Sequence, residues 1–183
     1  MALAGCGGDE RHAEQSLTYS VAIPVRSFPA RQRLAAPVDL RIDVRNVGSR
    51  AIPNVAATIS TGGVHGAAVD AFGSRLEGEG LASHSRPVWI VDEGPASGET
   101  AYTNTWALGA IPPHETRSFT WSVVPVRAGD FTLRYMLTGS TTGRSPLRLE
   151  DGGAARGSFD VRVSGKPAQV RVTADGRIVT ESP

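Results

Sequence analysis

The chain has 183 residues and a formal net charge of +1 at pH 7, with 40% hydrophobic and 20% charged residues. This length fits one domain with a sizeable core, and the near-neutral charge excludes a strong field that would steer the chain toward nucleic acid. A single cysteine excludes an intrachain disulfide, and no apolar run approaches the ~20 residues of a membrane-spanning helix.

That cysteine closes the run Leu3-Ala4-Gly5-Cys6, and polar residues follow it up to about position 15. The run resembles a bacterial lipobox, which predicts lipid attachment at Cys6, a tether over residues 1–15 and an extracytoplasmic protein anchored to a bacterial membrane. Five residues are too few for the basic and apolar regions of such a signal. The prediction therefore requires that the recorded start lies inside a longer signal peptide or that the chain was trimmed there. The alternative is a chance cluster of small residues beside an ordinary cysteine.

Alternation of apolar and polar residues predicts the first strands. Residues 17–25 alternate, and residues 38–45 have the clearest period of two in the chain. The second pattern indicates one buried face and one solvated face, on which aspartate and arginine interleave. Asn46-Val47-Gly48-Ser49 supplies turn chemistry, and residues 53–59 predict the next strand.

Residues 61–105 are the long irregular part of the sequence. Residues 61–86 lack a clear period, and an unstructured loop of this length is uncommon in a compact domain unless it is functional or mobile. Short strands are predicted at residues 88–91 and 102–108, on either side of an acidic turn at 92–98. Because loops on a rigid scaffold often carry function, we predict that this insertion forms the functional surface.

The second half of the chain predicts further strands. Alternating apolar residues occur at 119–123, 131–137 and 159–163, and a small hairpin is predicted around Asp175-Gly176. Helical periodicity over ten or more residues is absent. The sequence therefore predicts an all-β fold, an antiparallel immunoglobulin-like β-sandwich of about seven to nine strands over residues 16–164, followed by a hairpin or tail at 165–183.

Three stretches resemble the bacterial immunoglobulin-like adhesion modules, above all the CARDB group of cell-adhesion-related domains. Residues 38–55 resemble the opening strand pair with its Asn-x-Gly turn, residues 106–116 the aromatic-x-Leu-Gly segment before a Pro-rich turn, and residues 124–135 the Gly-x-aromatic-x-Leu strand. The resemblance implies the sandwich fold and a role in cell-surface interaction or spacing, and it brings no catalytic residues. Those modules have a short link where this chain has residues 61–105.

The sequence contains no recognisable catalytic or metal-binding motif. His12, His65, His84 and His114 lack metal-ligand spacing, and the Gly-x-Ser-x-Gly elbow of serine hydrolases is absent. A loop site built from His65 and His84 is the alternative to surface histidines. We predict no enzymatic activity, no cofactor and no metal.

The acidic turn and its flanks carry the residues that we predict to contact a partner. Aromatic side chains beside charged groups often bind sugars or protein surfaces. The alternative for the two tryptophans is core packing between the sheets. The predicted partner-binding residues are Trp89, Asp92, Glu93, Glu99, Tyr102 and Trp106.

Together these patterns predict a non-catalytic, lipid-anchored protein of the cell envelope with an immunoglobulin-like binding or spacer module. Its expected partners are the membrane, through the lipid on Cys6, and an envelope protein or glycan, but not nucleic acid. One alternative is an accessory subunit of an envelope transport or secretion complex. Another is a protein that acts on or binds wall sugars through residues 61–105.

Overall fold

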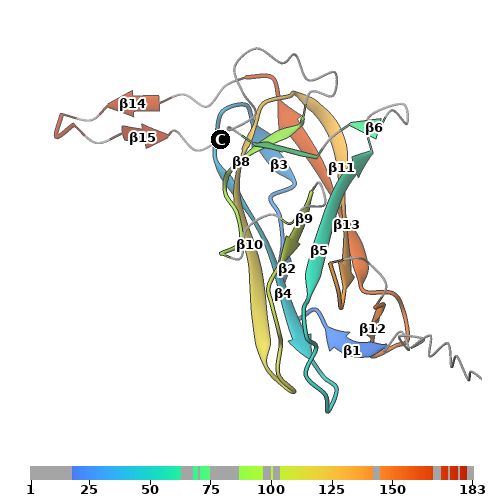
Figure 1. The fold of residues 1–183 in the computed structure, drawn as a ribbon. Helices are drawn as coiled ribbons and strands as arrows, with labels where there is room; N and C mark the ends of the chain where they lie inside the picture. The colour runs from blue at the N-terminus through green and yellow to red at the C-terminus, as the bar shows by residue number, and fades with distance from the viewer. Residues whose placement is uncertain are drawn as a thin grey trace, which may run out of the picture.

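The computed structural model describes residues 18–62, 68–69, 71–74, 87–96, 100, 104–141, 145–166, 170–172, 174–176 and 178–180. These residues form two β-sheets that face each other and a hairpin that lies apart from them (Figure 1). The strands are β1 (Tyr19–Ala22), β2 (Arg26–Ser27), β3 (Arg31–Arg33), β4 (Val38–Asn46), β5 (Ala56–Gly62), β6 (Ala68–Val69), β7 (Phe72–Ser74), β8 (Trp89–Glu93), β9 (Thr105–Ala107), β10 (Thr116–Pro125), β11 (Gly129–Thr138), β12 (Leu147–Leu149), β13 (Arg156–Ser164), β14 (Val170–Val172) and β15 (Ile178–Thr180).

The first sheet has the order β12-β1-β4-β10-β8-β7, with β2 also paired to β4. The second sheet has the order β3-β13-β11-β5-β6, with β9 also paired to β5. The predicted sandwich is confirmed, but the sheets are mixed and not purely antiparallel. The pairs β1–β12, β3–β13 and β7–β8 are parallel. These short strands join segments of the chain whose pairing the alternation pattern cannot reveal, and they raise the strand number above the predicted seven to nine.

The core lies between the two sheets, where the alternating apolar residues meet. In the first sheet Ile42 lies opposite Phe119 and Leu40 opposite Trp121, and all four side chains are buried. In the second sheet β11 supplies the buried residues Phe131, Leu133, Tyr135 and Leu137. Each such side chain stabilises the fold by about 1.5–3 kcal/mol when it is fully buried, so the core needs no disulfide.

Edge-to-face and stacked ring contacts connect the aromatic side chains of the core. Trp89 contacts Phe28, Phe72 and Phe131 at ring-centre distances of 5.5, 6.3 and 5.9 Å. Trp106 in turn lies 5.6 Å from Phe72. The aromatic network therefore joins rings of both sheets into one cluster.

The described residues of the segment 61–105 are part of this sandwich. Its strand β8 pairs with β10, β7 pairs with β8, and β9 pairs with β5. The apolar residues of the segment that are buried in the core are Ala71, Phe72, Val88, Trp89 and Trp106. The expectation of an irregular stretch at residues 61–86 does not hold at Ala71 and Phe72, whose side chains are buried in the core. Val88, Trp89 and Trp106 lie in the segments 88–91 and 102–108, for which the sequence predicts strands. Residues 75–86 lie outside the described residues.

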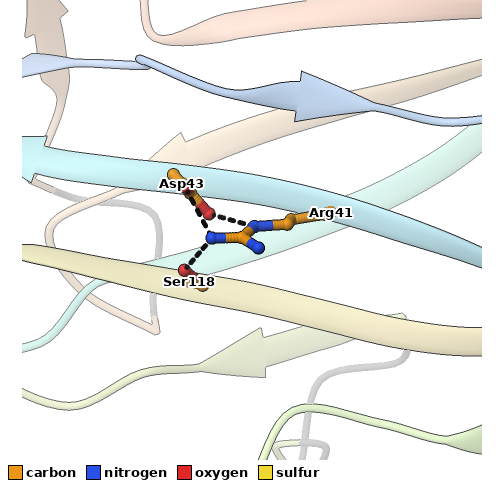
Figure 2. A network of polar contacts seen from close by, with 3 residues as sticks. All are labelled: Arg41, Asp43 and Ser118. Carbon is orange, nitrogen blue, oxygen red and sulfur yellow. Dashed lines mark hydrogen bonds and ion pairs between the residues drawn. The ribbon is translucent and has the colours of Figure 1, made fainter.

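Asp43 is the exception to the predicted solvated face of β4. Its side chain is buried, with a relative exposure of 5% for the residue. The Arg41 guanidinium donates to both carboxylate oxygens, from Nε at 2.8 Å and from Nη2 at 3.0 Å, and Nη2 also lies 3.5 Å from Ser118 Oγ on β10 (Figure 2). The hydrogen bond from Arg41 lowers the pKa of Asp43 from its ordinary value. The contact with Arg41 therefore stabilises the charged form of the buried Asp43 carboxylate.

Acid is expected to weaken the fold through Asp43. Its pKa is lower in the folded chain than in the unfolded chain, so this carboxylate contributes stability above the unfolded value of about 3.9 and loses it as the pH falls through the folded value. Urea unfolding should show that the difference in midpoint between wild type and Asp43→Asn shrinks from pH 6 toward about pH 2. The exposed Asp39 on the same strand gives the control, Asp39→Asn. An Asp43→Asn deficit that is constant across this range would contradict the prediction.

The C-terminal strands β14 and β15 pair antiparallel with Val172 opposite Ile178. Gly176 lies in the turn between them with a φ of +79°, a conformation that glycine adopts without strain. In Figure 1 this hairpin projects away from the sandwich.

Candidate functional site

The outer face of the second sheet presents polar side chains in ordered rows. In β11 the apolar residues at odd positions face the core, so the even positions point to the opposite face. The register with β5 and β13 places these side chains in four rows, which we call the outer rows: Thr58–Met136–Arg156, Ser60–Arg134–Ser158, Gly62–Thr132–Asp160 and Asp130–Arg162. Strands β5, β11 and β13 lie side by side in Figure 1.

Two hollows lie along the outer rows. One has a volume of about 560 Å³ and is lined by the first two rows together with Tyr135 and Gly157. The other has a volume of about 470 Å³ and is lined by the third and fourth rows together with Ala30, Arg31, Phe131 and Val161. The two hollows therefore occupy consecutive rows of one sheet face.

The aspartates of the outer rows are engaged by neighbouring side chains. Arg162 Nε donates to Asp130 Oδ1 at 2.6 Å, and this hydrogen bond lowers the pKa of Asp130 from its ordinary value. Thr132 Oγ1 donates to Asp160 Oδ1 at 2.8 Å. These contacts hold both carboxylates within their own rows.

Arg134 and Arg156 have no such partner. In the part of the chain that the structure describes, neither side chain makes a hydrogen bond or an ion pair, and both residues are exposed. Arg134 lies over Gly62, where an added Cβ would come within 2.5 Å of its Nη1 atom. A glycine at this position thus leaves room for the guanidinium. Each guanidinium presents five N–H donors and a fixed positive charge, so the hollow can accept an anionic group.

The predicted partner-binding residues that the structure describes, Trp89, Asp92, Glu93 and Trp106, do not form one exposed site. Trp89 and Trp106 are buried in the core, as the core-packing alternative holds. Trp89 Nε1 donates at 2.7 Å to Gln32 Oε1, a contact that ties β8 of the first sheet to β3 of the second. Asp92 and Glu93 are exposed at the end of β8.

The other predicted positions lie mostly outside the described residues. Cys6, Glu99 and Tyr102 fall there, as do His12, His65 and His84. His114 is exposed on the link before β10, in a backbone conformation with a φ of +64°.

The sequence did not reveal the outer rows as a candidate site. Their signal is the set of polar residues at alternate positions of three segments, 58–62, 130–136 and 156–162. In a single strand this pattern looks like any solvated face. The rows become visible only when the pairing β5–β11–β13 is known, because it places Arg134 and Arg156 on neighbouring rows.

Among the described residues, no group of three or more His, Cys, Asp or Glu side chains is placed to hold a metal ion. None of the described residues belongs to a helix that is long and apolar enough to cross a membrane.

Solved structures with a similar fold include three kinds of protein. A CARDB domain from Pyrococcus furiosus, solved in complex with di-metal ions, is 12% identical over 80% of this chain and 86% of that chain, with a TM-score of 0.44. Native alpha-2-macroglobulin from Escherichia coli, spanning domain MG7 to the C-terminus, is 10% identical over 88% of this chain and 21% of that chain, with a TM-score of 0.44. Beta-glucosidase from Listeria innocua, in complex with glucose, is 13% identical over 80% of this chain and 16% of that chain, with a TM-score of 0.41.

No protein-family model matches the chain, and no curated protein matches it. Because these TM-scores are low, the fold class is assigned from the two facing sheets of the structure and not from the similar structures. The chain is an immunoglobulin-like β-sandwich, and its similar structures include a domain of the CARDB family that its three sequence motifs resemble.

Proposed function

We propose that the chain is a non-catalytic binding or spacer module that a lipid on Cys6 anchors to the outside of a bacterial membrane. The observation that carries the proposal is the run Leu3-Ala4-Gly5-Cys6, which holds the one cysteine of the chain and precedes a polar stretch and a β-sandwich. A lipid chain anchors a protein in proportion to the CH₂ groups that it buries in the bilayer. The polar residues after Cys6 would then separate the sandwich from the membrane surface.

The side chains of the outer rows support binding over catalysis. A glycosidase needs two carboxyl groups that flank the scissile bond, one of them available as an acid. Here Asp130 accepts from Arg162 and Asp160 accepts from Thr132. Arg134 and Arg156 each carry a guanidinium with five N–H donors, so these side chains suit the binding of a ligand.

Metabolic labelling tests the anchor. The gene, expressed in a bacterial host together with the coding sequence upstream of Met1, is expected to incorporate an alkyne fatty acid, and Cys6→Ala should carry no label. Fractionation should place wild type with the membranes and release Cys6→Ala from them. Equal labelling of the two proteins, or no label on either, would overturn the proposed anchor.

A further inference from the structure

We propose that the outer rows bind an acidic polysaccharide, with Arg134 and Arg156 holding the carboxylates of its sugars. This inference deepens the binding role proposed above by naming the class of ligand. It does not depend on the lipid anchor, because every residue that carries it lies in the described sandwich.

The charge of the outer rows selects an anion. In the register of β3 and β13, Arg31 lies beside Arg162 and Arg33 beside Ser164. This face therefore holds five arginines, Arg31, Arg33, Arg134, Arg156 and Arg162, against two aspartates, Asp130 and Asp160. On the outer face of the first sheet, Arg41 is engaged by Asp43, and Arg45 is exposed. A guanidinium without a partner matches a carboxylate in geometry and charge.

The neighbours of Arg134 and Arg156 complete a site for a sugar acid. Ser60 and Ser158 flank Arg134 in its row, about 5 Å away on either side as cross-strand neighbours. Met136 lies between Thr58 and Arg156 in the adjoining row. It is a large apolar residue with a relative exposure of 48%. A sugar acid presents a carboxylate, hydroxyl groups and an apolar C–H surface, so each part of it meets a side chain of matching chemistry.

The sheet face disfavours an extended acidic peptide. Peptides that bind to sheets in an extended form add to a free edge and pair with its backbone. Strand β11 pairs with β13 over residues 129–136 and with β5 over residues 132–138, so its backbone has no free edge between Thr132 and Met136. Recognition here must come from side chains alone.

The length of the rows favours a polymer. From Asp130 to Met136 the rows extend over about 20 Å, because an antiparallel strand rises about 3.4 Å per residue. Both hollows, of about 560 and 470 Å³, lie along this line. No aromatic side chain belongs to the outer rows, so the ring stacking that serves neutral sugars is replaced by charge.

Calorimetric titration of the full chain carrying Cys6→Ala tests the proposal, with short oligomers of galacturonic acid and of mannuronic acid as probes. We expect binding to at least one of them, weakened by added salt. Arg134→Ala and Arg156→Ala should each lower the affinity about tenfold or more, as expected for the loss of a charged hydrogen bond. The matched control is Arg45→Ala, an exposed arginine on the outer face of β4, which should bind as wild type does.

Three results would overturn the proposal: no binding to either oligomer, equal binding to a neutral galactose oligomer, or the same loss of affinity in Arg45→Ala. Equal affinity for a short polyglutamate peptide would replace the polysaccharide with an acidic protein. Arg134 and Arg156 are exposed, so their variants should unfold at the same temperature as wild type, and this measurement separates lost binding from lost folding. Fatty-acid labelling of Cys6 is a separate measurement, so the anchor and the ligand can fail independently.

Discussion

Replacing Trp121 with alanine is expected to lower the free energy of unfolding by about 3–5 kcal/mol, the range for large aromatic residues removed from a core. Trp121 is fully buried and lies opposite Leu40. Its ring stacks on Phe119 at 5.4 Å and meets the edge of Trp106 at 5.6 Å. The cavity left by alanine would therefore open at the centre of the aromatic cluster. Urea or guanidinium unfolding measures the effect, and a loss below about 1 kcal/mol, well under the usual range, would contradict it.

Phenylalanine at the same position gives a sharper comparison. The Trp121 Nε1 atom is buried and has no hydrogen-bond partner in the structure. A buried donor without a partner costs about 1–3 kcal/mol, and Trp121→Phe removes it while it keeps an aromatic ring in the cluster. We therefore expect Trp121→Phe to lose less than half of the stability that Trp121→Ala loses. Thr120→Ala, an exposed position on the same strand, is the control for a surface change.

The core of the sandwich could be predicted from the sequence because its strands alternate strictly. Trp121, the apolar residues of β4 and the apolar residues at the odd positions of β11 follow a period of two and face the core as predicted. Alternation reports which face of a strand is buried, and it does so without knowledge of the partner strand. For the same reason it gave no information about the parallel pairing of β1 with β12 or of β3 with β13.

Burial of Asp43 and the role of residues 87–93 could not be predicted in this way. The alternation of residues in β4 places Asp43 on the polar face of the strand. Only its contacts with Arg41 and Ser118 in the folded structure explain why it is buried. The sequence predicts a short strand at residues 88–91, but the glycine-rich stretch before it has no period that would show how this strand pairs. The burial of Trp89 depends on β7 and β10, which pair with β8 from both sides.

Prediction of the candidate site requires knowledge of strand pairing even more than prediction of the core does. Arg134 and Arg156 are far apart in the sequence, and each lies in a strand whose polar face resembles any solvated face. The antiparallel register that sets Arg134 opposite Ser158 and Met136 opposite Arg156 brings them onto adjacent rows. A functional surface made by a sheet face is thus encoded in strand order, which is a property of the whole fold.

Replacing Asn46 with aspartate is expected to destabilise the chain by about 3–5 kcal/mol at pH 7, as for other buried charges left without a partner. Asn46 is fully buried at the end of β4. Its Nδ2 group donates to the Arg50 carbonyl at 2.7 Å and to the Ile111 carbonyl at 2.9 Å, while its Oδ1 accepts from the Gly48 N–H at 3.0 Å. The side chain thus closes the Asn-x-Gly turn and fastens it to the link before β10.

The aspartate variant keeps the shape of the side chain and reverses its chemistry. In place of a donor, a carboxylate oxygen would face the two carbonyl oxygens of Arg50 and Ile111, and burial would favour the neutral acid. The pKa of the introduced group should therefore be higher in the folded chain than in the unfolded chain. Relative to wild type, the variant should be least stable at neutral pH and should recover as the pH falls toward about 4, the ordinary range of an aspartate.

Asn54→Asp is the matched control, because Asn54 uses its Oδ1 atom to accept from the Gly109 N–H at 3.1 Å. A carboxylate can accept that hydrogen bond equally well, so this variant should stay within about 1 kcal/mol of wild type. Urea unfolding of both variants between pH 4 and pH 7 separates the two roles. Similar losses in Asn46→Asp and Asn54→Asp, or a loss in Asn46→Asp that does not change with pH, would mean that the donor function of Asn46 is not what holds this turn. The opposite pH trends expected for Asn46→Asp and for the natural Asp43 follow from one difference, since Asp43 meets a guanidinium and the introduced carboxylate would meet two carbonyls.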